Sequence, residues 1–125
     1  MQAIYAEFGV AVQVTYRTQA DDPILGEGTL PRPGVGAADT WEAISASTDE
    51  LALDVVLVDT IAGAGPAELG SAGSIPGGIL PSERSGVILS VTANAGPDLA
   101  FSADEIDLFG VNIAPQVGYM LGLFQ

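Results

Sequence analysis

The chain contains no cysteine, no histidine and no lysine. Without cysteine it can form neither a disulfide nor a thiolate nucleophile. Without cysteine and histidine, zinc and copper sites lack their usual ligands. Serine is plentiful, but no histidine or lysine is present to activate one as a nucleophile. These absences argue against an enzyme and against a transition-metal cofactor.

Positive charge is almost missing. Three arginines face 16 acidic residues, which gives a net charge of −13. Because there is no basic patch to displace counterions from phosphates, we expect no nucleic-acid partner. An anionic membrane is disfavoured for the same reason, and no apolar run approaches the roughly 20 residues that a membrane span needs. The acidity fits a salt-rich setting, docking on a basic partner, or plain solubility.

Calcium binding needs only oxygen ligands, and acidic residues gather at three places: 21–22, 49–50 and 104–107. None of the three has the spacing of a calcium-binding loop, and solvated acids in turns explain them equally well. With so many acids, a close carboxylate pair carries little information about glycosidase chemistry. We therefore predict no metal, no cofactor and no catalytic residue.

One glycine pattern resembles the opening of a dinucleotide-binding turn. Gly63-Ala64-Gly65 follows an apolar, strand-like stretch. However, Glu68 stands where the third glycine of that fingerprint would fall, and its charge would repel a pyrophosphate. No convincing amphipathic helix follows. The sequence therefore does not predict a nucleotide site.

The apolar patterning favours strands. From Ile4 to Tyr16 every even position is apolar, which predicts a strand over 3–17. A strand this long must either bend near Gly9 or pair outside its own subunit. Valine- and isoleucine-rich stretches predict further strands over 51–61, 86–93, 99–102, 106–113 and 117–125. The centre of 51–61 is apolar on both faces, which predicts an interior strand.

Helix signals are few. Asp39 begins a short helix in which Trp41 and Ile44 would be buried. Ser102 and Glu105 have capping-box spacing, so a helix over 102–110 is an alternative there. We favour the strand because Ile106 and its neighbours alternate with acids. The chain is thus predicted to be all-β, with at most one or two short helices.

Two Gly/Pro-rich segments, near 18–38 and 62–86, interrupt the pattern and predict extended loops or arms. The predicted architecture is a single small β-sandwich or jelly-roll-like domain over 1–125. Apolar anchors in the second arm and aromatics off the apolar strand faces are candidate interface residues: Tyr5, Leu69, Ile75, Ile79, Leu80 and Phe124.

In size, β-content and arms, the chain resembles the head decoration (cement) proteins of tailed bacteriophages. The resemblance implies a non-enzymatic virion protein that docks on and stabilises a capsid shell. It also implies a major capsid or other virion protein as partner, and a homo-oligomer, such as a trimer. Met1-Gln2-Ala3 lacks a basic n-region, so no signal peptide is expected. Outside a virion we expect a soluble protein. Two alternatives stay open: a fibre-base, tail or connector subunit, and a calcium- or carbohydrate-binding β-module.

Overall fold

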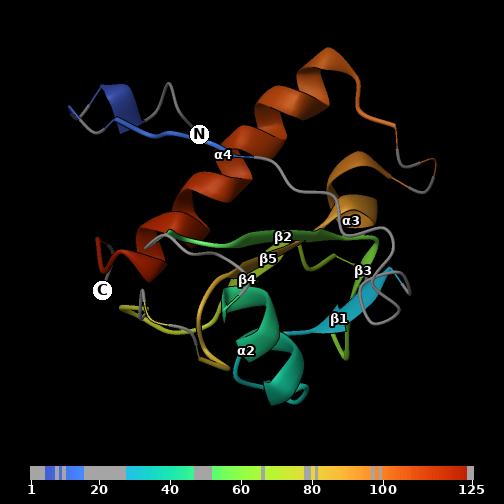
Figure 1. Ribbon diagram of the computed structural model, residues 1–125. Helices are drawn as coiled ribbons and strands as arrows, with labels where there is room; N and C mark the ends of the chain where they lie inside the picture. The colour runs from blue at the N-terminus through green and yellow to red at the C-terminus, as the bar shows by residue number, and fades with distance from the viewer. Residues whose placement is uncertain are drawn as a thin grey trace.

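The computed structural model describes residues 5–7, 9, 11–15, 28–46, 52–65, 67–77, 80, 82–96, 98 and 100–123. A small sheet lies in the middle of the molecule, with α4 on one side and α2 on the other (Figure 1). The elements are β1 Thr29–Pro31, α2 Ala38–Ala46, β2 Val55–Val58, β3 Thr60–Ala62, β4 Gly70–Ala72, β5 Val87–Ser90, α3 Val91–Ala95 and α4 Ala103–Met120.

The strand β5 is the centre of a three-stranded sheet with the order β2-β5-β4. It pairs with β2 in parallel and with β4 in antiparallel fashion. Val87, Ile88 and Leu89 have no exposed surface, which is expected for a strand covered on both faces. The interior strand is therefore β5 and not, as predicted, the one within 51–61. β2 lies at the sheet edge, and its Leu57 is 53% exposed.

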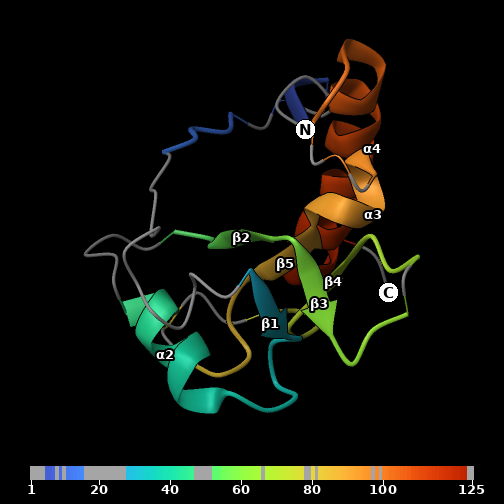
Figure 2. The same cartoon turned by 90° about the vertical axis from the view of Figure 1, so that its right-hand side faces the viewer.

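One face of this sheet is covered by α2 and by a parallel pair, β1 and β3 (Figure 2). Ile88 of β5 joins the buried cluster on this face, which consists of Leu30, Trp41, Ile44, Val58, Ile61 and Ile88. Trp41 has no exposed surface, and its Nε1 donates to the Pro31 carbonyl at 3.0 Å. The predicted short helix with buried Trp41 and Ile44 is confirmed.

The opposite face of the sheet is covered by α4. Val87 and Leu89, the neighbours of Ile88 along β5, point to this side because successive side chains of a strand alternate. They pack with Met120 from the last turn of α4. Phe109 and Ile113 of α4 pack against the same cluster. The core is therefore two apolar layers that share β5.

The predicted all-β sandwich or jelly roll is wrong. The described residues form five strands in two small sheets and three helices, one of which runs for 18 residues. The predicted strand over 3–17 is also wrong where the structure describes it. Tyr5 and Ala6 are helical, and residues 11–15 form no strand. Tyr5 and Val12 instead pack against Ala114 and Val117 of α4.

The strands predicted near the C-terminus are wrong as well. Residues 91–95 form α3, and α4 replaces the strand over 106–113 and the part of 117–125 up to Met120. In the stretch 99–102, the described residues 100–102 form no strand.

Helical packing explains this difference. Phe109, Ile113 and Val117 recur every four residues, so they lie along one side of a helix. In the structure these three side chains meet the buried clusters beneath α4. Ala114, Val117 and Met120 are buried as well, and their spacing of three would place Val117 on the opposite face of a strand from the other two.

The Gly/Pro-rich segment over 62–86 is attached to the rest of the molecule. Its described residues include β4, and the Gly77 amide donates to the Met120 carbonyl at 2.7 Å. A Cβ on Gly73 would clash with the Arg84 backbone carbonyl, so two parts of the segment approach closely here. The described part of 18–38 contains β1 and the start of α2.

Candidate functional site

A hollow of about 400 Å³ lies along β3 and beside the end of β5. The carboxyl ends of parallel strands often bind ligands. Hydroxyl groups and small residues line it: Thr29, Thr60, Ser90, Thr92, Gly63 and Gly65. The hydroxyls of Thr29, Thr60 and Ser90 are engaged with one another or with the backbone. The oxygens Thr29 Oγ1 and Thr60 Oγ1 are 2.9 Å apart, and Ser90 Oγ donates to the Asp59 carbonyl at 3.0 Å.

The carboxylate at this hollow is Glu68, and it is engaged too. Arg32 Nε donates to Glu68 Oε1 at 2.6 Å, and a second guanidinium nitrogen contacts the other oxygen. This forked pair raises the pKa of Arg32, mainly through the hydrogen bond and secondly through the charge of Glu68. Residues 67–77 contain no helix to receive a phosphate after Gly65. Within the described residues, no group of three or more histidine, cysteine or acidic side chains is placed to hold a metal.

The more unusual surface belongs to α4. Asp104, Leu108, Val111 and Pro115 are all exposed, and their spacing of four, three and four places them on one side of the helix, away from the core. We call these four residues the outer α4 face. Leu108 is 54% exposed and Val111 is 53% exposed. A surface helix normally carries polar residues on this side, so the apolar pair is a candidate contact surface.

The N-terminus of α4 is fixed by a capping box. Ser102 Oγ accepts from the Glu105 amide at 3.3 Å, and the Ser102 amide donates to Glu105 Oε2 at 2.8 Å. The Ser102 side chain, followed by its backbone amide, lowers the pKa of Glu105 because both hydrogen bonds favour the charged carboxylate. Next to this cap, the rings of Phe101 and Phe109 lie 5.0 Å apart.

This cap predicts a pH-dependent contribution to stability. Ser102→Ala should cost about 1 kcal/mol of unfolding free energy at pH 7. Since the folded pKa of Glu105 lies below its ordinary value of 4.5, the contribution of its charge is present above that pH and is lost as the pH falls. Glu105→Gln should therefore destabilise the protein at pH 7, and this effect should be smaller at pH 3, measured by urea denaturation. Glu42→Gln, an exposed change on α2, is the control. An equal effect of Glu105→Gln at both pH values would contradict this role.

The middle and end of α4 are held by polar and apolar contacts. Asn112 Nδ2 donates to Asn94 Oδ1 of α3 at 2.8 Å. The Tyr5 hydroxyl donates to the Ala114 carbonyl at 2.8 Å, and Met120 is 4% exposed in the core. These contacts attach the helix to α3, to the N-terminal segment and to the core.

The predicted interface residues differ in how far the structure exposes them to solvent. Tyr5 is 5% exposed and packs under α4, so it does not face solvent, and its burial raises the pKa of its hydroxyl. Leu69, Ile75 and Leu80 are exposed, at 39%, 56% and 67%. Ile79 and Phe124 lie outside the described residues. The structure does not gather the exposed three into one described patch with the outer α4 face.

Sequence reasoning missed Leu108 and Val111 as candidate contact residues. The strand interpretation placed Leu108 on a buried face with Ile106, whereas the helix turns Leu108 outward. The Ser102–Glu105 spacing was the signal that could have found them. Once a helix starts at that cap, the four-three-four spacing of the outer α4 face follows from the sequence.

No protein-family model matches the sequence, and searches of curated proteins and of solved structures returned no similar protein. None of the described helices combines the length and the apolar character that crossing a membrane requires.

Proposed function

We propose that the chain is a non-enzymatic structural subunit that docks on a larger protein assembly. The observation that carries this proposal is the outer α4 face, where Leu108 and Val111 stay half exposed on a helix that is otherwise well anchored. Exposed leucine and valine at helical spacing favour a protein contact over solvent. The engaged hydroxyls and the ion-paired Glu68 of the hollow offer no comparable support for catalysis.

We further propose that the assembly is a virion, in which the chain decorates and stabilises the capsid shell. Support comes from the small size, the two Gly/Pro-rich segments and the missing catalytic residue types. The resemblance to phage decoration proteins rests on the size and the two Gly/Pro-rich segments, since the β-sandwich is not part of the structure.

The test is binding to the particle. Wild-type protein should co-sediment with purified virions or empty shells, and Val111→Glu should lower the bound fraction about tenfold or more, because it places a charge in the contact. Val35→Glu is the matched control, since Val35 is 63% exposed in the loop between β1 and α2, on the side away from α4 (Figure 1). Wild-type protein that remains a monomer and is absent from every particle fraction would overturn the proposal.

A further inference from the structure

We infer that the outer α4 face binds a basic amphipathic segment of its partner, with apolar anchors flanked by lysine or arginine. This inference rests on the proposed docking function and adds the chemistry of the partner. It follows from the apolar and acidic groups on one side of α4 and from the distribution of charge over the molecule.

The apolar part of the surface is a short row along the helix. Leu108 and Val111 are one turn apart, and the exposed Pro115 extends the row by another turn. Proline has no amide hydrogen, so Pro115 cannot donate to the Val111 carbonyl as a helix residue normally would.

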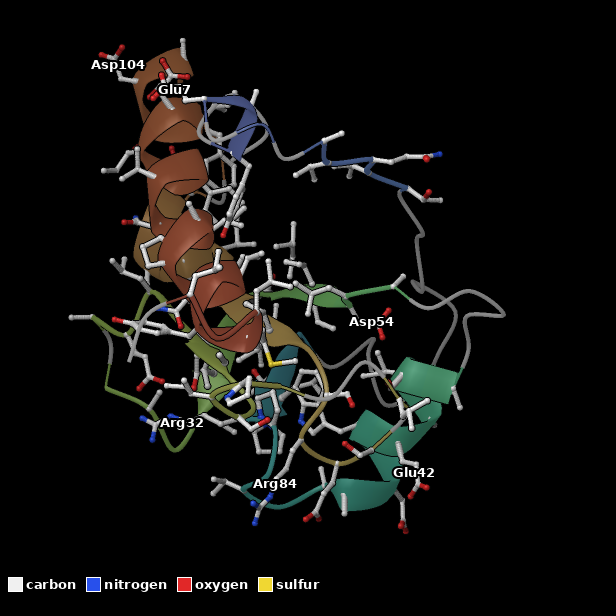
Figure 3. All side chains as sticks on the ribbon, turned by 90° about the vertical axis from the view of Figure 1, so that its left-hand side faces the viewer. Glu7, Arg32, Glu42, Asp54, Arg84 and Asp104 are labelled. Atoms are coloured by element: carbon white, nitrogen blue, oxygen red, sulfur yellow. The ribbon has the colours of Figure 1, made fainter. Side chains whose placement is uncertain are left out.

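The acidic part lies immediately N-terminal to the apolar pair. Asp104 is one turn before Leu108, and Asp107 is one turn before Val111; both aspartates are exposed. Arg32 pairs with Glu68, and Arg84 pairs with Glu83. Figure 3 shows both arginines at the end of the molecule opposite Asp104. Neither described arginine therefore neutralises the acids beside the row, and a basic partner would do so.

A second copy of the chain is a poor occupant of the same surface. Parallel pairing of two α4 helices would set Asp104 and Asp107 against the same residues of the copy. Antiparallel pairing would set them against the C-terminal end of the other helix, which carries partial negative charge. Each copy also brings a net charge of −13. A basic segment avoids all three repulsions and supplies apolar anchors as well.

The probe is a synthetic helical peptide with a leucine face flanked by lysines. It is compared with a peptide whose flanks are glutamate and with a scrambled peptide of the same lysine and leucine content. Binding to the full chain is measured by fluorescence anisotropy at about 0.1 M and about 1 M NaCl. We expect the lysine-flanked peptide to bind about tenfold more tightly than either comparison peptide at the lower salt, and to weaken at the higher salt.

Substitutions in the outer α4 face test whether the peptide binds there. Leu108→Ser and Val111→Ser should each weaken binding of the lysine-flanked peptide about tenfold, while Val35→Ser should leave it unchanged. Circular dichroism confirms that each variant keeps its helix content. Equal binding of the scrambled peptide, or no effect of both serine variants, would overturn the inference. So would a dimer in analytical ultracentrifugation that Val111→Ser dissociates, because the occupant would then be a second copy.

The two proposals can fail separately. If the chain co-sediments with particles through Val111 but shows no preference for the lysine-flanked peptide, only the basic partner is wrong. If the peptide binds through Leu108 and Val111 but the chain is absent from every particle, the inferred docking surface for a basic segment stands and the virion role is wrong.

Discussion

Replacing Trp41 with alanine should lower the free energy of unfolding by about 3–5 kcal/mol. Trp41 has no exposed surface and lies in the cluster between α2 and the sheet. The substitution removes the largest side chain of that cluster and leaves a cavity. It also removes the indole hydrogen bond to the Pro31 carbonyl, which ties β1 to α2. Since small domains have about 5–15 kcal/mol of stability in total, this is a large share.

Urea denaturation followed by circular dichroism measures the loss. Trp41→Phe is the informative companion, because it keeps a ring in the cluster but removes the donor to Pro31; its cost should be about half as large. Glu42→Ala, at the exposed position that follows Trp41 in α2, is the control for helix propensity. A cost below about 1 kcal/mol for Trp41→Ala would mean that the α2 layer is not part of the cooperative core.

The parts that could be predicted from the sequence are those in which local signals agree. The helix-start signal at Asp39, the apolar Trp41 and Ile44, and the short length of the stretch all indicate one short helix, and α2 has this form. The runs around β2 and β5 are β-branched and bounded by turn residues, and both form strands. Which of the two would lie in the interior could not be predicted, because strand order depends on long-range pairing.

The C-terminal part shows two local signals in conflict. Ile106 and Leu108 alternate with acids if 106–113 is considered alone, whereas a window that extends to Met120 fits a helix. The capping box at Ser102 is formed in the structure. Proline and glycine within α4 weakened the helical signal, but packing of Met120 and Val117 against the core outweighs their propensity cost.

The strand predicted over 3–17 is wrong for a related reason. A period of two describes which residues are apolar, but a strand also needs a neighbour to pair with. The described three-stranded sheet ends at β2 and β4, and Tyr5 packs against α4 instead. The lack of histidine, cysteine and lysine favoured a contact surface over a catalytic site from the start. The position of that surface could not be predicted without recognising the helix.

Replacing Asn94 with aspartate should cost about 3 kcal/mol of stability at neutral pH. Asn94 is 8% exposed and joins three parts of the chain. Its Nδ2 donates to the Ser90 carbonyl at 2.7 Å and to the Leu69 carbonyl at 3.1 Å, and its Oδ1 accepts from Asn112 of α4. A carboxylate has the same shape but cannot donate, so one of its oxygens would face two carbonyl oxygens in a buried site.

The sign of the pH dependence makes this prediction specific. Burial and the two carbonyls would raise the pKa of the introduced aspartate above its unfolded value of about 3.9. The penalty is then fully present above the raised folded pKa, shrinks as the pH falls through it, and is smallest below the unfolded pKa. Urea denaturation of wild type and Asn94→Asp between about pH 3 and about pH 7 should show that the difference between their free energies of unfolding decreases as the pH falls. Asn94→Leu removes the same hydrogen bonds without adding a charge. The difference between its free energy of unfolding and that of wild type should therefore be nearly independent of pH.

The same residue connects stability with docking. Because Asn94 holds Asn112, its loss should loosen the attachment of α4 to α3 and with it the outer α4 face. In a double-mutant cycle, Asn94→Leu and Asn112→Ala should be clearly non-additive, since each removes the same hydrogen bond. Asn94→Leu should also weaken binding of the lysine-flanked peptide, although Asn94 lies outside the outer α4 face. Additive costs, together with unchanged peptide binding, would mean that α4 is held by its other contacts, namely the Tyr5–Ala114 hydrogen bond and the apolar contacts at Val117 and Met120.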